Sequence, residues 1–119
     1  MIIVKGSIPV KTAHREEAVD LVQRLARASR DEHGCLAYEV YIQADAPEVI
    51  MVWQQWSDLD ALETHFASDH VDSFLDAIPD LIEGQVTSAR FDVSAFEDDS
   101  DFEDQLELPQ VLMDGIVLH

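Results

Sequence analysis

The sequence predicts an α+β protein with a ferredoxin-like fold: a split βαβ arrangement whose four-stranded antiparallel sheet carries its helices on one face. First, the segments follow the order strand, helix, strand, strand, helices, strand, which is the order of that fold. Second, residues 36–43 alternate between two faces, and residues 49–56 are apolar on both. Third, two regions between the first and the last predicted strand place apolar residues at helical spacing.

The first strand and the first helix occupy residues 2–34. Residues 2–10 predict a strand, interrupted by Gly6 and ending near Pro9, which cannot donate a ladder hydrogen bond. A helix follows from Thr12, a suitable N-cap. Its apolar stripe consists of Ala18, Val22, Leu25 and Ser29, with Val19 and Ala26 beside them. Gly34 ends this unit, because glycine tolerates the left-handed conformation found after helices.

The next two strands form a hairpin. Leu36, Tyr38, Val40 and Ile42 share one face of the first of them, and a polar break at residues 43–48 leads to the second. The second strand, residues 49–56, has Val49, Met51 and Trp53 on the face directed away from the helices. Such a patch is unusual on a monomer. We therefore expect a homodimer that closes through the two sheets.

The last part of the domain consists of two helices and a strand. Ser57 is the expected cap of the first helix, because its hydroxyl can accept a first-turn N–H. The two apolar stripes are Leu59, Leu62 and Phe66, and then Val71, Phe74, Leu75 and Ile78. Pro79 should end or kink the second helix, since it lacks an N–H donor. Residues 85–93 then predict the final strand.

Composition excludes several classes of protein. The chain has 119 residues, the length of one domain, and a formal net charge of −18. That charge argues against nucleic-acid binding, which needs clustered Lys and Arg. The sequence contains no long apolar run that would span a membrane and no secretory signal pattern at its start. The single cysteine, Cys35, excludes an intrachain disulfide. Together these features indicate a cytoplasmic protein.

The sequence divides into a folded domain, residues 1–93, and a C-terminal segment, residues 94–119. Residues 91–119 contain no Lys or Arg, and residues 94–107 are acidic and thinly apolar, which predicts a linker. Residues 108–119 hold two short apolar runs around Asp114-Gly115, a favoured hairpin dipeptide. Two outcomes remain open for this end: docking on the folded domain of either subunit, or a disordered terminus.

Three short motifs follow one another between residues 34 and 70. They read Gly34-Cys35-Leu36-x-Tyr38-Glu39-Val40-Tyr41, then Val52-x-x-x-Trp56, then Leu62-Glu63-x-His65-Phe66-x-Ser68-x-His70. As a combination they resemble the antibiotic biosynthesis monooxygenase family, which includes small quinol monooxygenases, and the resemblance covers roughly residues 1–93. It implies the fold derived above, paired through its sheets as a dimeric α/β barrel.

The resemblance also implies an activity and its residues. That activity is cofactor-independent oxidation of an aromatic, phenolic or quinol-type ligand by molecular oxygen, for which the protein supplies a base and a dry pocket. His70 matches the histidine of the family's Ser-Pro-His pattern, with Asp69 in place of the proline, and is the expected catalytic base. The expected substrate pocket consists of Tyr38, Trp56, His65, Phe66 and Phe74. Gln54 stands where many members have glutamate.

No cofactor and no metal are expected. The sequence has no Gly-rich phosphate loop. Residues 5–8 lack the asparagine that haem-degrading relatives carry on the first strand. Cys35, His65 and His70 are possible zinc ligands, but no paired ligand motif accompanies them.

Two functions therefore remain. One is a small monooxygenase of the type just described. The other is a non-catalytic dimeric module on the same fold that binds a small ligand or stabilises a partner, because a fold by itself does not fix a function.

Overall fold

A computed structural model describes residues 1–94 of the chain. Its elements are β1 (Ile2–Pro9), the short 3-10 helix η1 (Thr12–His14), α1 (Arg15–Arg30), β2 (Cys35–Ile42), β3 (Val49–Trp56), α2 (Leu59–Phe66), α3 (Asp69–Ala77), the short 3-10 helix η2 (Ile78–Asp80) and β4 (Thr87–Asp92). The predicted acidic linker and apolar C-terminal segment lie, apart from Ser94, outside the described residues.

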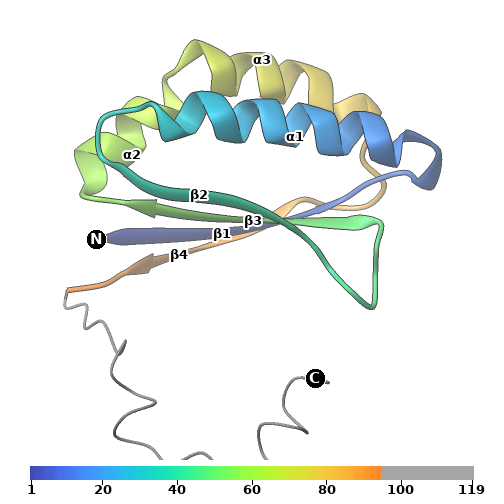
Figure 1. Ribbon diagram of the computed structural model, residues 1–119, viewed down its shortest axis with the longest axis horizontal. Helices are drawn as coiled ribbons and strands as arrows, with labels where there is room; N and C mark the ends of the chain where they lie inside the picture. The colour runs from blue at the N-terminus through green and yellow to red at the C-terminus, as the bar shows by residue number, and fades with distance from the viewer. Residues whose placement is uncertain (95–119) are drawn as a thin grey trace, which may run out of the picture.

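The molecule has two layers, a sheet and a set of helices that cover one of its faces (Figure 1). The strand order is β2-β3-β1-β4, and every neighbouring pair is antiparallel. The long helix α1 runs across the sheet, with α3 beside it and α2 toward one end. This arrangement confirms the predicted ferredoxin-like fold. Within residues 1–94, no helix has the length and apolar character needed to cross a membrane.

The core lies between the sheet and α1. Alternate residues of β3 are buried toward the helices, and the last of them, Trp56, has no exposed surface. The predicted stripe of α1 meets this face: Ala18, Val22, Leu25, Ala26 and Ser29 are all buried. Since the period of two in β3 and the helical period of α1 bury matching faces, the two patterns determine how the layers pack.

Three local details differ from the sequence prediction. A bulge between Cys35 and Ala37 shifts the register of β2, so that Leu36 leaves the predicted face and is 57% exposed. Asp58, rather than Ser57, caps α2, because its Oδ1 accepts the Ala61 N–H at 2.9 Å. The two predicted helical stripes also include residues that the structure leaves exposed, namely Leu59, Phe66 and Leu75.

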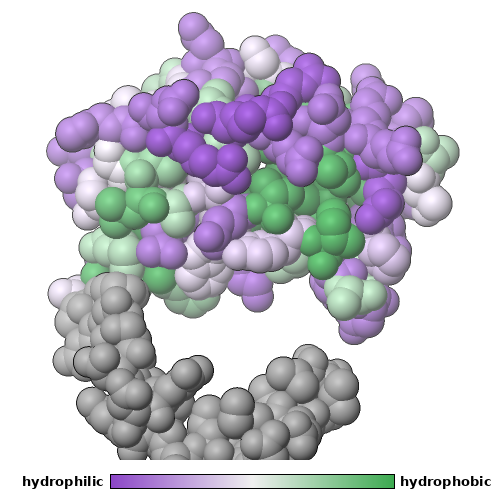
Figure 2. Space-filling view, in the orientation of Figure 1, coloured by the Kyte–Doolittle hydropathy of each residue, from purple (hydrophilic) through white to green (hydrophobic). Residues whose placement is uncertain are grey.

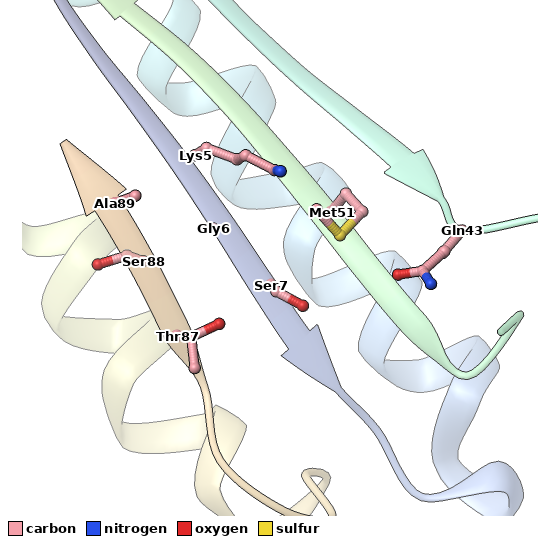
Figure 3. Close-up of a pocket in the computed structure, with 8 residues that line it drawn as sticks. All are labelled: Lys5, Gly6, Ser7, Gln43, Met51, Thr87, Ser88 and Ala89. Carbon is pink, nitrogen blue, oxygen red and sulfur yellow. The ribbon is translucent and has the colours of Figure 1, made fainter. Parts of the chain in front are cut away.

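The opposite face of the sheet carries no helix within the described residues (Figure 1). Figure 3 shows this face, where Lys5, Ser7 and Met51 surround a shallow hollow of about 410 Å³. Val49, Met51 and Trp53, the predicted outward residues of β3, are each half-buried. At the β2 edge, Leu36, Tyr41 and Ile42 are exposed. In Figure 2, hydrophobic side chains gather below the hydrophilic helical layer.

A tight turn joins α1 to β2 and depends on Gly34. The glycine has φ of +85°, a conformation that side chains disfavour. A Cβ at this position would also lie 2.5 Å from the Cβ of Ala61 on α2. The Gly34 carbonyl accepts the Ser57 N–H at 2.8 Å. The turn is therefore packed directly against the start of α2.

We expect Gly34→Ala to lower the free energy of unfolding by about 1–3 kcal/mol, because it adds left-handed strain and a clash with Ala61. Chemical denaturation measures this change. The matched control is Gly6→Ala on β1, where a Cβ would meet no atom closer than 3.9 Å. Equal stability of the two variants would show that the close approach of Gly34 to α2 is unimportant.

Candidate functional site

A cavity of about 250 Å³ lies between the helical face of the sheet and the helices α2 and α3. Its lining is mostly apolar, with contributions from all four strands and from α1, α2 and α3. The polar side chains in it include Tyr38, Gln54 and His65. A largely apolar cavity with a few polar groups is the usual form of a small-ligand site.

His65 is the polar residue most firmly held in this cavity. It is on the last turn of α2 and is only 2% exposed. Its ring lies against Trp56, with the ring centroids 4.5 Å apart and an interplanar angle of 34°. Its Nδ1 is 2.6 Å from Oε2 of Glu32. The ring nitrogen that remains for a molecule in the cavity is therefore Nε2.

Glu32 comes from the turn between α1 and β2. The Glu32 N–H donates to the Ser29 carbonyl at 3.0 Å, and the Glu32 carbonyl accepts the Cys35 N–H at 3.2 Å. These two backbone hydrogen bonds, with the close packing of Gly34, fix where the carboxylate lies. Its side chain is 14% exposed. The turn thus carries a nearly buried carboxylate to the end of α2.

His70 contacts the same carboxylate oxygen from another helix. Its Nε2 lies 2.8 Å from Oε2 of Glu32, and its side chain is 29% exposed. Ser68 sets the spacing between the two histidines: its hydroxyl donates to the His65 carbonyl at 2.6 Å and accepts the Val71 N–H at the start of α3. His70 lines a separate hollow with Arg24 and Ser73, outside the main cavity.

Trp56 orients a second polar group in the cavity. Its Nε1 donates to Oε1 of Gln54 at 3.0 Å. Because the indole N–H can only donate, it must meet the carbonyl oxygen of the amide, and the NH₂ group of Gln54 is left for other partners. Gln54 is buried and lines the cavity. It therefore offers hydrogen-bond donors to a ligand oxygen.

The structure places four of the six residues predicted for the site around the cavity. Tyr38, His65, Phe66 and Phe74 line it. Trp56 lies behind His65 instead, fully buried. His70 reaches the site only through Glu32. The prediction missed Glu32. The one sequence signal for this residue was its position two residues before Gly34, the predicted helix stop.

The Glu32, His65 and His70 side chains also resemble a set of metal ligands, with their ligand atoms within 4.8 Å of one another. Two ligands bonded to one zinc ion at about 2.1 Å lie roughly 3 Å or more apart. The nitrogen–oxygen separations here, 2.6 and 2.8 Å, are hydrogen-bond distances. The geometry is thus that of a hydrogen-bonded carboxylate, and Cys35 is not part of the cluster.

Burial governs the protonation of the site. Burial lowers the pKa of His65, and His70 lowers it further, although Glu32 opposes both by hydrogen bonding and by charge. Burial also raises the pKa of Tyr38 well above its usual range. At neutral pH the cavity therefore holds a neutral imidazole and a neutral phenol. A neutral imidazole with a free Nε2 can accept a proton from a bound ligand.

Comparison with known proteins gives consistent matches. The sequence profile described as "antibiotic biosynthesis monooxygenase" matches residues 1–77. An uncharacterised protein of Synechocystis sp. is 32% identical over 81 residues, which are 68% of this chain and 55% of that protein. This chain thus spans about half of that relative's length. YcnE of Bacillus subtilis, provisionally named a monooxygenase, is 26% identical over 79% of this chain and 99% of its own length.

A solved structure has the same fold. The Deinococcus radiodurans protein, provisionally named an antibiotic biosynthesis monooxygenase, superimposes with a TM-score of 0.78 at 25% identity. The match covers 82% of this chain and 97% of that protein.

The lowered pKa of His65 predicts a stability change with pH. Between its folded and unfolded pKa values the unfolded chain binds more protons, so stability should fall as pH drops below about 6.5. Denaturation between pH 7 and pH 5 should therefore show a smaller loss for His65→Gln than for the wild type. His33→Gln, at an exposed histidine of the same turn, is the control. An identical pH dependence in all three proteins would contradict the burial argument.

Proposed function

The chain belongs to the antibiotic biosynthesis monooxygenase family, and we propose that it is a small cofactor-independent monooxygenase that oxidises a phenol or quinol with molecular oxygen. One observation carries this proposal: His65 lines an apolar cavity while its Nδ1 is held by Glu32. That combination supplies a base, an apolar environment and a fixed direction, which are what such a reaction needs from a protein.

The proposed chemistry starts with proton transfer. Nε2 of His65 takes the hydroxyl proton of the substrate, and the Gln54 amide donates a hydrogen bond to the phenolate oxygen. The electron-rich phenolate then reduces oxygen. One oxygen atom enters the product, the substrate loses two hydrogens, and the second oxygen atom leaves with them as water. The substrate provides all the electrons.

The size of the cavity limits the substrate. Its volume of about 250 Å³ is below the roughly 300–1,000 Å³ of sites for drug-sized ligands. A cavity of about 150 Å³ is sufficient for benzene. We therefore propose a substrate with one or two fused rings, held between the aromatic side chains Phe66 and Phe74 and the floor of the sheet.

Two histidines, His65 and His70, are candidates for the base. The sequence motif favours His70, and that assignment stays a prediction. We favour His65, because it lines the cavity whereas His70 lines a neighbouring hollow. His70 also has its Nε2 engaged by Glu32.

A homodimer is also part of the proposal. The face of the sheet opposite the helices presents Val49, Met51 and Trp53, all half-buried within a single chain. Pairing two such faces would cover the hollow of Figure 3 and exclude water from these side chains. A standard interface of this kind buries about 1,600 Å² in total.

Oxygen uptake with hydroquinones, naphthols and anthrones tests the activity. We expect uptake with one- or two-ring substrates, and a loss of roughly 10²-fold or more in kcat/KM for His65→Gln. His33→Gln should behave as the wild type, because this exposed residue lies outside the cavity. Full activity in His65→Gln together with inactive His70→Gln would return the role of base to His70. Tight binding of these compounds without oxygen uptake would favour the non-catalytic binding module.

Analytical ultracentrifugation at micromolar concentration tests the dimer. The wild type should sediment at twice the chain mass, and Trp53→Glu should sediment as a monomer because it places a charge in the centre of the proposed interface. Leu59→Glu, at an exposed position on α2, is the matched control. A wild type that stays monomeric up to the highest soluble concentration would refute the pairing.

A further inference from the structure

One oxygen atom, Oε2 of Glu32, is shared by two imidazole rings that come from different helices. It lies 2.6 Å from Nδ1 of His65 and 2.8 Å from Nε2 of His70. An ionised carboxylate can only accept hydrogen bonds, so both ring nitrogens carry the hydrogen. This assigns a tautomer to each neutral ring. His65 is protonated at Nδ1, and His70 at Nε2.

We propose that Glu32 and His70 are positioning residues for the base: Glu32 holds His65 with Nε2 toward the cavity, and His70 holds the carboxylate of Glu32. This inference rests on the proposed function, since it assumes that His65 acts as the base. It adds two residues that are not themselves part of the cavity lining.

The case for Glu32 rests on how completely its partner ring is fixed. Trp56 lies against the His65 ring, and Tyr38 meets it edge-on, with ring centroids 5.7 Å apart. These contacts set the plane of the ring but do not choose between its two nitrogens. The hydrogen bond from Nδ1 to Glu32 makes that choice. Only that tautomer leaves a lone pair on Nε2.

The case for His70 rests on its different surroundings. It is 29% exposed, while His65 is 2% exposed, so its ring stands between the buried carboxylate and solvent. It does not line the cavity, and Arg24, which lines the adjoining hollow with it, is already paired with Asp20. Within the described residues, His70 makes one hydrogen bond to an acidic side chain. Its partner is the Glu32 oxygen that His65 also contacts.

The two positioning residues should affect the base in opposite directions. The titratable groups around His65 are Glu32 from the turn, Tyr38 from β2 and His70 from α3, with Cys35 of β2 beyond Glu32 and Tyr38. β3 contributes the neutral Gln54 and Trp56. The Glu32 charge raises the pKa of His65, and His70 lowers it. Removing Glu32 should make His65 a weaker base, and removing His70 should make it a stronger one.

The pH dependence of kcat/KM tests the assignment. In Glu32→Gln we expect a loss of about tenfold or more, with the acid limb of the profile moved to lower pH. In His70→Phe the limb should move to higher pH with a smaller loss of rate. His70→Gln should restore part of that rate, since its amide can still donate to Glu32. If kcat/KM falls in both variants but the acid limb of the pH profile stays in place, Glu32 and His70 have merely structural roles and the proposal is overturned.

NMR titration of the free protein provides a test that needs no substrate. With ¹⁵N-labelled histidine, His65 should show the tautomer protonated at Nδ1, and its titration should move in opposite directions in Glu32→Gln and His70→Phe. A wild-type His65 protonated at Nε2 would refute the inference, whether or not the protein consumes oxygen. Should Glu32→Gln not fold, the wild-type tautomer and the partly exposed His70 variants still decide the question. If His65 is protonated at Nδ1 but the protein takes up no oxygen, the proposed function is rejected while the positioning of His65 by Glu32 stands.

Discussion

The carboxylate of Glu32 is joined by hydrogen bonds to two histidines on separate helices, and the geometry of the site depends on that connection. A nearly buried carboxylate needs partners of this kind, because an unpaired charge away from water is costly. Three pieces of the chain meet there: the turn after α1, the end of α2 and the start of α3. Their packing therefore does more than complete the core, since it places one imidazole at the wall of a cavity.

The fold could be predicted because its patterns are periodic. The alternation of residues 36–43 predicts a strand, the stripe of α1 predicts a helix with one buried face, and the order of elements then leaves few topologies. The errors fall where a single residue overrides the period. One bulge turns Leu36 outward, and one aspartate takes over the capping of α2 from Ser57.

The candidate site was less predictable, because its contacts are distant in sequence. His65 and His70 are five residues apart, but Glu32 is more than thirty residues before them, and no local pattern links it to either. The resemblance to the family named His70 as the base and His65 as a pocket residue, which differs from the assignment that the cavity favours. Their ranking requires burial and cavity lining, which depend on how α2 and α3 pack on the sheet. Trp56 shows the same limit: it was predicted as a cavity wall, yet it lies behind His65 and orients Gln54.

Gly6 gives the cavity floor an unusual property. It is paired with Ser88 across β1 and β4 and faces the helices, so two adjacent positions of the floor carry almost no side chain. A Cβ added at Gly6 would contact its neighbours at no less than 3.9 Å. The backbone there thus has room for a Cβ, and a side chain at this position would take up part of the cavity. The volume of this cavity is thus open to change at Gly6 and Ser88, on β1 and β4, at positions separate from the two histidines and the carboxylate.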